Sequence, residues 1–180
     1  MAGRKDRLGE EDPGAFLPGS DLSGIGYKDF IPGVWYHRTI TLTGEELKGD
    51  LLLHFGAVDY DARVWINGVE AGRHQGGYVS FTFNITNLVK EGENDITLFA
   101  ADDVRGGKQP KGKQSHFFYS RGCDYTRTTG IWQTVWLEWV PESYIEKVQY
   151  YPNLAEATLG IKAVVKGGRG AHWKQKRPFL

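Results

Sequence analysis

Two pairs of aspartates stand close together in the sequence and could supply acid and base groups. They are Asp59/Asp61 and Asp102/Asp103. Hydrolysis of a glycosidic bond needs two carboxyl groups about 5–10 Å apart, one on each side of the bond. Asp59 and Asp61 lie on the same side of an extended chain, whereas Asp102 and Asp103 point to opposite faces. Because carboxylates are also common at turns, these pairs alone do not predict a self-contained hydrolase.

The sequence offers little for metal, thiol or nucleotide chemistry. The five histidines show no metal-ligand spacing, and Cys123 has no second cysteine to pair with. Residues 107–114, GKQPKGKQ, differ from the phosphate-binding pattern G-x-x-x-x-G-K-[ST] only at the last position. Gln114 lacks the hydroxyl that would hold magnesium, and no helix is expected after it. We therefore predict no metal site and no cofactor.

The tryptophans indicate an aromatic face. In the expected strand at residues 130–139, one side carries Ile131, Val135, Leu137 and Trp139, and the other carries Trp132, Thr134, Trp136 and Glu138. Trp65 likewise shares the polar face of its strand with Arg63. Large aromatic rings on a charged face either stack on sugar rings or are covered by another domain. The sequence leaves both interpretations open.

Charge and composition exclude several classes of protein. The 180 residues contain 22 Lys+Arg and 22 Asp+Glu, but residues 1–160 carry a net charge of −6 and residues 161–180 carry +6. An acidic body argues against nucleic acid as the partner, because such binding needs a basic face. No apolar run approaches the roughly 20 residues of a membrane span. The polar N-terminus lacks the apolar stretch of a secretory signal, so a cytoplasmic location is expected.

The elements that must position these side chains are β-strands. Runs rich in β-branched and aromatic residues, bounded by turn residues, predict strands. They lie at residues 35–42, 51–58, 61–66, 77–85, 95–101, 130–139, 144–151 and 157–165. Asn67-Gly68 predicts a hairpin turn with a strand resuming at Val69, and residues 85–89 predict a short helical piece. Eight strands and no long helix predict an all-β sandwich or barrel.

Two segments are expected to lack strands. Residues 1–30, rich in Gly, Pro and Asp, are expected to lie over the surface. Residues 102–122 form a loop with five basic residues and an aromatic cluster at residues 116–119. Loops of that length in compact domains are usually functional or disordered. The cluster could contact a ligand or simply anchor the loop.

Several motifs in fixed order resemble the N-terminal sugar-binding domain of glycoside hydrolase family 2. They are FLPGSDLSGIGYKDFIPGVWYHRTITL, LLLHFGAVDYDARVWINGVEAGRHQGGYVSFTFNIT, NLVKEGENDITLFAADD and DYTRTTGIWQTVWLEW, within residues 16–142. The family includes β-galactosidases, β-glucuronidases and β-mannosidases. The resemblance implies an all-β jelly-roll sandwich of the galactose-binding type, with extra C-terminal strands.

The resemblance also implies a domain organisation. Residues 1–15 would be a flexible segment, 16–142 the jelly roll, 143–166 the start of an immunoglobulin-like domain, and 167–180 a basic tail outside the family pattern. The tail suggests a truncated protein. The family's acid/base is a Glu preceded by Asn in a TIM barrel, and no Asn-Glu dipeptide occurs here. The chain by itself is therefore expected to be catalytically silent, with no catalytic residues of its own.

Sugar contacts are carried over from the family residue by residue. Asp103 matches the acidic residue that closes the strand before the long loop in β-galactosidases, with Asp102 as an alternative register. Asp124, six residues before Gly130, matches a sugar-contacting Asp of β-glucuronidases. A carboxylate can accept two hydroxyl hydrogen bonds at once, but Asp124 could equally cap a turn. Further candidates are Tyr119, Tyr125, Arg127 and Trp132, with Trp65 and Trp136 on the aromatic face.

We accordingly predict a non-catalytic accessory domain that binds carbohydrate weakly through loop carboxylates and aromatic rings. The expected ligand is a β-galactoside, a β-glucuronide or a plant oligosaccharide, and the expected protein partners are the missing catalytic domains. The alternatives are a pure scaffold domain or, last, an independent glycosidase. Strands at residues 144–151 and 157–165 are expected to fold back on the jelly roll or to pair with a second chain, so a homodimer is a further expectation.

Overall fold

The computed structural model describes residues 5–7, 18–19, 21, 24–167 and 174–178. These residues form strands without an α-helix; the 3₁₀ helix η2 (Thr86–Leu88) falls inside the helical piece predicted at residues 85–89. No helix in this part of the chain is long and apolar enough to cross a membrane. The prediction of an all-β sandwich is confirmed.

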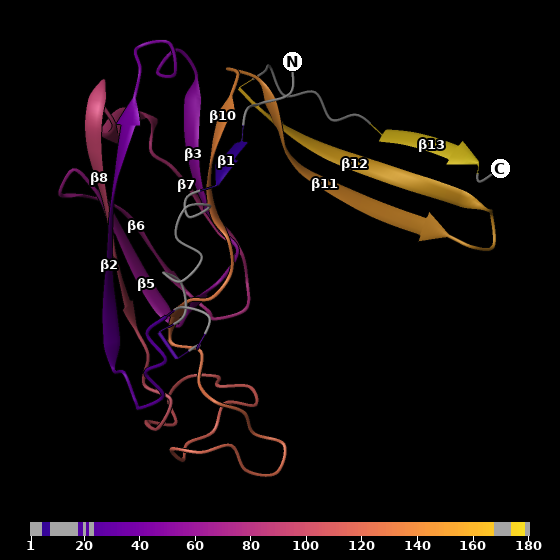
Figure 1. The fold of residues 1–180 in the computed structure, drawn as a ribbon. Coiled ribbons are helices and arrows are strands. Elements are labelled where there is room, and N and C mark those ends of the chain that lie inside the picture. Colours follow the sequence, from indigo (N-terminus) through magenta and orange to yellow (C-terminus); the bar gives the residue numbers. More distant parts are fainter. Residues whose placement is uncertain (1–4, 8–17, 20, 22–23, 168–173, 179–180) are drawn as a thin grey trace. The chain divides into compact units, whose positions relative to one another are not determined.

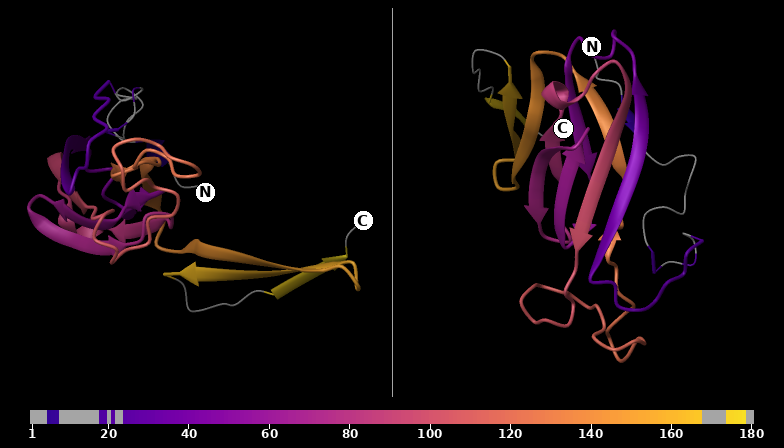
Figure 2. Two further views of the ribbon diagram at one scale, coloured as in Figure 1. Left: turned by 90° about the horizontal axis from the view of Figure 1, so that it is seen from below. Right: turned by 90° about the vertical axis from the view of Figure 1, so that its left-hand side faces the viewer.

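The chain divides into two compact units, of which the larger comprises Arg4–Trp139. Its strands form two four-stranded sheets that lie as separate layers (Figures 1 and 2). One sheet has the order β2 (Gly33–Leu42), β8 (Gly92–Ala101), β5 (Asp61–Ile66) and β6 (Val69–Gln75). The other has the order β1 (Lys5–Arg7), β10 (Val135–Val140), β3 (Asp50–Phe55) and β7 (Phe81–Asn84).

The core lies between the two sheets and follows the alternation of the strands. Every second residue of β5 and of β8 is buried, and β3 and β10 contribute the facing layer. Side chains on alternating positions leave the water on one face only, which fixes the register of each strand. The buried cluster includes Leu42, Leu51, Leu53, Phe55, Val64, Ile66, Ile85, Leu98, Val135 and Leu137.

The predicted hairpin after β5 is confirmed. Asn67 and Gly68 both have positive φ, 51° and 80°, as a two-residue turn of this kind requires. The Asn67 side chain also donates to the carbonyl of Leu88 and to Oδ1 of Asn94, and accepts from the amide of Asp95. The turn is therefore held to neighbouring segments as well as to its own strands.

Gly130 occupies a position that only glycine fits. Its φ is 87°, and a Cβ there would lie 2.2 Å from the Tyr36 hydroxyl oxygen, which accepts the amide hydrogen of Ile131. Burial raises the pKa of Tyr36 to about 12. We expect Gly130→Ala to lower the free energy of unfolding by about 2–4 kcal/mol, through backbone strain and displacement of Tyr36.

Urea unfolding of Gly130→Ala and Gly68→Ala separates these two effects. Gly68 has a similar φ but nothing within 4 Å of an added Cβ, so Gly68→Ala should lose only the backbone part, about 1 kcal/mol. Equal losses in the two variants would contradict the role assigned to Tyr36.

A short pair of strands connects the sandwich to the long loop. β4 (Val58–Asp59) pairs with β9 (Gly130–Ile131). The chain then crosses from β4 into β5 through a cis peptide bond between Asp59 and Tyr60. Asp59 is buried, whereas Asp61 binds Arg73 on the outer face of β5. The expectation that Asp59 and Asp61 share one side of an extended chain is wrong, because they belong to different sheets.

The second unit contains residues from Val140 onward and is a three-stranded antiparallel sheet. β11 (Tyr144–Asn153) pairs with β12 (Thr158–Lys166), which pairs with β13 (Lys174–Pro178). The two strands predicted here therefore pair with each other. The tail at residues 167–180 contains the strand β13, which sequence patterns did not indicate. Residues 168–173 and 179–180 of the tail lie outside the described part.

The N-terminal segment also contains an unpredicted strand. β1 pairs antiparallel with β10, with Lys5 opposite Glu138 and Arg7 opposite Trp136. Three polar residues carry no apolar alternation, so the pairing depends on the available edge of β10 and not on local sequence. The remaining residues of the predicted flexible segment 1–15 lie outside the described part.

Candidate functional site

The long loop, at the lower end of the sandwich in Figure 1, is ordered by two glutamines that reach buried carboxylates. Gln114 donates to Asp59 and accepts the amide hydrogen of Thr128 at 2.9 Å. Gln109 donates to Asp102 at 2.6 Å and accepts the amide hydrogen of Asp103 at 3.1 Å. The segment that resembles a phosphate-binding loop therefore uses its glutamines for internal hydrogen bonds.

Asp59 and Asp102 form a buried pair of interacting carboxylates. Neither is accessible: Asp59 is 0% exposed and Asp102 is 4% exposed. Burial and, next, the charge of Asp102 raise the pKa of Asp59 to about 6, and burial raises the pKa of Asp102 as well. The buried pair thus combines one aspartate from each of the two pairs noted in the sequence, Asp59 from Asp59/Asp61 and Asp102 from Asp102/Asp103. Because both are enclosed, they serve to hold the loop and cannot flank a scissile bond.

Arg127 is the second anchor of this end of the molecule. It is 6% exposed and donates to the backbone carbonyls of Ser115, Phe117 and Lys28. Its guanidinium lies 4.1 Å from the centre of the Phe30 ring. Burial lowers the pKa of Arg127. These contacts tie the segment before β2 to the long loop.

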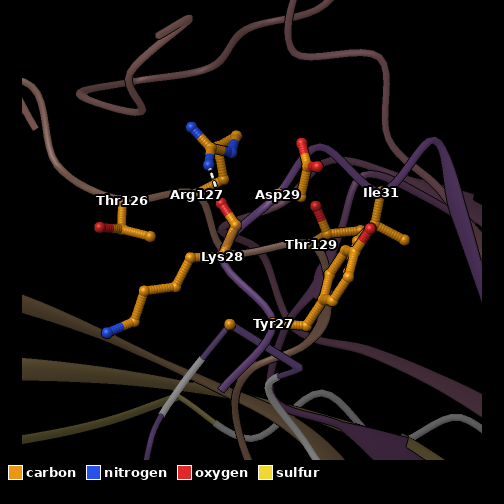
Figure 3. A pocket seen from close by; sticks show the side chains of 8 residues that line it. Tyr27, Lys28, Asp29, Ile31, Thr126, Arg127 and Thr129 are labelled. Atoms are coloured by element: carbon orange, nitrogen blue, oxygen red, sulfur yellow. Dashed lines mark hydrogen bonds between the residues drawn. The ribbon is translucent and has the colours of Figure 1, made fainter. Parts of the chain in front are cut away.

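A small pocket opens beside this anchor. It is lined by Gly19, Tyr27, Lys28, Asp29, Ile31, Thr126, Arg127 and Thr129. Figure 3 shows the guanidinium of Arg127 donating to the backbone of Lys28 at one side of the pocket. The lining mixes both charge signs and is formed largely by the segment that Arg127 holds in place.

Asp124 lies on the loop surface next to a lysine. The carboxylate is 28% exposed and stands 3.7 Å from Nζ of Lys111, which also donates to the carbonyl of Gln114 at 2.6 Å. Backbone hydrogen bonds in both directions join Asp124 to Arg121 and close a tight turn. Asp124 therefore closes a turn and at the same time presents an accessible carboxylate.

Two aromatic rings are linked to Asp124 indirectly, through the backbone of Lys111. The Tyr78 hydroxyl donates to the carbonyl of Lys111 at 3.3 Å, and the Tyr78 ring meets Trp132 edge to face at 5.8 Å between centres. Trp132 donates its indole N–H to the carbonyl of Gly77 at 2.7 Å. Asp124, Lys111, Tyr78 and Trp132 thus form a connected cluster, which we call the Asp124 cluster. Sequence reasoning missed Lys111 and Tyr78, which no local pattern distinguishes.

The other predicted loop residues are placed separately. Asp103 is exposed and begins a turn that closes at Gly106; no hydrogen bond or ion pair within the described residues joins it to Asp124. Tyr119 and Tyr125 are both more than half exposed. Asp102, the alternative to Asp103, is buried and bound to Thr129 at 2.6 Å, so Asp103 is the accessible one of the two.

The two tryptophans of the predicted aromatic face lie on different sheets. Trp136, on β10, stacks on His54 with 4.7 Å between ring centres and an interplanar angle of 6°. Trp65, on β5, stacks on Trp35 of β2 at 5.6 Å. The single strand predicted at residues 130–139 is wrong, because β9 and β10 are separate strands that belong to different sheets. Ile131, Val135 and Leu137 are buried, as expected, whereas Trp132 and Trp136 are only half-buried.

The accessible chemistry of this end is therefore hydrogen bonding and stacking. Asp124 and Asp103 offer acceptors for hydroxyl groups, Lys111 offers a donor, and exposed tyrosines offer ring faces. The described residues contain no group of three or more His, Cys, Asp or Glu side chains that could hold a metal.

Comparison with known proteins identifies the body of the chain. Residues 26–141 match the family model for the sugar binding domain of glycosyl hydrolases family 2. The chain is 32% identical over 139 residues to a beta-galactosidase of Thermoanaerobacter pseudethanolicus, covering 74% of this chain and 18% of that protein. It is 27% identical over 166 residues to the beta-glucuronidase of Felis catus, covering 78% and 25%. The chain thus spans a quarter or less of the length of these relatives.

The fold agrees with solved structures. Faecalibacterium prausnitzii beta-glucuronidase superposes with a TM-score of 0.70 at 18% identity, covering all of this chain and 41% of that one. At this identity the likeness concerns the fold. It extends to the C-terminal strands, which the family match at residues 26–141 does not reach.

Proposed function

The chain belongs to glycoside hydrolase family 2 through its sugar-binding domain, and from this premise we propose that it is a non-catalytic carbohydrate-binding domain of a β-glucuronidase-like or β-galactosidase-like enzyme. Relatives from both activities match the same region. The catalytic groups would belong to other domains of the parent enzyme. The chain itself would contribute contacts to the sugar and no acid, base or nucleophile.

The observation that carries this proposal is the Asp124 cluster. The cluster has an accessible carboxylate, a lysine at 3.7 Å, a tyrosine that is hydrogen-bonded to the backbone of that lysine, and a tryptophan that contacts the tyrosine ring. These groups supply the acceptor, the donor and the ring face that a pyranoside uses. Asp124 is also the position that the family resemblance assigns to a sugar contact. Asp103, exposed in a separate turn, would act as a second contact, and Tyr119 and Tyr125 would border the ligand.

Asp124→Asn tests this proposal. We expect methyl β-D-glucuronide or methyl β-D-galactoside to shift the amide NMR signals of residues in the Asp124 cluster, with a dissociation constant in the millimolar range. Loss of a charged hydrogen bond is expected to weaken binding by about 10-fold or more. Glu45→Gln removes one charge at an exposed site that is paired with Lys48, and this variant should bind as the unaltered protein does. Equal binding by both variants would contradict the assignment of Asp124.

A scaffold role is the second candidate, and the position of Trp132 favours it. Its indole N–H is already bonded to Gly77 and its ring packs on Tyr78, so Trp132 already has an internal structural role. On this reading no glycoside shifts any signal of the cluster, and the domain acts through contacts with the rest of the enzyme. The same titration therefore separates the two candidates.

A further inference from the structure

A cluster of three aromatic rings lies on the outer face of the sheet β2–β8–β5–β6, the face turned toward the viewer in the right panel of Figure 2. Trp35 stands directly opposite Phe99 on the next strand, with 4.7 Å between ring centres. Trp35 also stacks on Trp65 at 5.6 Å with an interplanar angle of 29°. We call these three residues the Trp35 platform. It contains none of the loop residues assigned above.

The platform is both exposed and fixed in place. Trp35 is 63% exposed, although a buried Trp would contribute far more to stability. The Phe99 ring lies over Gly33, where a Cβ would come within 2.6 Å of the ring. The register of β5 against β6 shifts between Val64 and Trp65, and bulges of this kind re-aim side chains. The rings are therefore positioned by the sheet and not by each other alone.

Charged groups surround the platform, and one of them is unpaired. On the same face Asp61 accepts hydrogen bonds from Arg73, and Nε2 of His37 lies 3.1 Å from Oδ1 of Asp95, so both carboxylates have a partner. Arg63 stands directly opposite Phe99 on β5 and is exposed. Among the described residues it makes no hydrogen bond or ion pair. Its positive charge helps to lower the pKa of Asp61, but its N–H groups stay available on the strand beside Phe99.

We propose that the Trp35 platform and Arg63 form a second carbohydrate site, which takes a pyranose unit bearing a carboxylate. The apolar face of a pyranose ring stacks on Trp35, and the guanidinium of Arg63 binds the carboxylate through two parallel hydrogen bonds. Three aromatic rings with charged side chains on the same face offer a stacking surface and polar groups for one sugar unit. A protein interface needs about 20–30 residues on each side and an apolar centre.

Titration calorimetry with a pair of oligosaccharides tests this site. The acidic probe is a xylotriose carrying one glucuronosyl unit, and the neutral probe is xylotetraose. We expect the acidic probe to bind at least 10-fold more tightly. Trp35→Ala and Arg63→Gln should each weaken its binding by about 10-fold, with Arg63→Gln abolishing the difference between the two probes. Thermal unfolding confirms that both variants remain folded, since both side chains are exposed.

Two controls keep the result specific. Tyr150→Ala removes an aromatic side chain of equal exposure, 64%, from β11 and should leave binding unchanged. Asp124→Asn should also leave it unchanged, which separates this site from the proposed loop site. The proposal is overturned if neither probe binds, if both bind equally, or if Trp35→Ala binds normally. Self-association that Trp35→Ala abolishes would instead assign the platform to a contact between copies of the chain.

Discussion

Asp59→Asn is expected to reduce the loss of stability that the unaltered protein shows as the pH rises from 4 to 7.5. Asp59 has a pKa raised from 3.8 to about 6 by burial and by Asp102. A carboxyl whose folded-state pKa is raised stabilises the fold fully below pH 3.8, and this contribution is lost as the pH rises through 6. The rise in pKa corresponds to about 3 kcal/mol of unfolding free energy.

The asparagine side chain keeps the acceptor oxygen and cannot ionise. It can still accept from Gln114 and Thr128, as Asp59 does. We therefore expect the unfolding free energy of the variant, relative to that of the unaltered protein, to increase by about 3 kcal/mol from pH 4 to pH 7.5. Urea unfolding at a series of pH values measures this difference. Two parallel profiles would contradict the role of the buried pair.

Asp61→Asn supplies a control of opposite sign. Its hydrogen bonds to Arg73 lower the pKa of Asp61, so its contribution is present at neutral pH and is lost as the pH falls through the folded-state pKa. Relative to the unaltered protein, this variant should be less stable throughout pH 4 to pH 7.5, and the difference should shrink only below pH 3.8, where the carboxyl group of the unaltered protein takes up its proton. Replacing Asp59 and replacing Asp61 are thus expected to change the pH dependence of stability in opposite directions.

Arg127→Ala is expected to release the long loop and to lower the free energy of unfolding by about 3–4 kcal/mol. The guanidinium donates hydrogen bonds to three backbone carbonyls, two in the long loop and one in the segment before β2, and it stacks on Phe30. Each hydrogen bond from a charged group contributes about 1.5–3 kcal/mol, and the carbonyls it leaves are partly enclosed. The cleavage rate by trypsin at Lys108, Lys111 and Lys113 should rise together with this loss.

Two matched variants show whether geometry or charge matters. Arg127→Lys keeps the charge but cannot donate in a fork to three carbonyls, so it should behave nearly as the alanine variant does. Arg105 stacks on the same Phe30 ring at 4.1 Å but is exposed, so Arg105→Ala should cost less than about 1 kcal/mol. An Arg127→Lys protein as stable as the unaltered one would contradict the anchoring role.

The pattern of the strands was predictable, because each strand of the sandwich has one buried face. The runs that became β2, β5, β8 and β12 alternate or cluster their apolar residues, and Asn67-Gly68 supplies the positive φ of a hairpin turn. β1 and β13 were not predictable. Their residues are polar, and they became strands because β10 and β12 offer backbone partners.

Which functional side chains are accessible depended on the chain's path between sheets. Sequence proximity placed Asp59 with Asp61 and Asp102 with Asp103, yet the structure buries Asp59 near Asp102 and leaves Asp61 and Asp103 on the surface. The crossing from β4 to β5 separates the first pair, and the end of β8 separates the second. Lys111 and Tyr78 joined the Asp124 cluster through the fold of the loop, and no spacing rule links them to it.

By itself the sequence determined the all-β class, most strand positions and the family, because all of these follow from local periodicity and from motifs in fixed order. Only the tertiary structure decided which charges are enclosed, which aromatic rings form a platform and which arginine is an anchor. The reason is physical: burial, pKa and hydrogen-bond partners depend on residues far apart in the chain, and the side-chain spacing of a single strand carries no record of what packs against it.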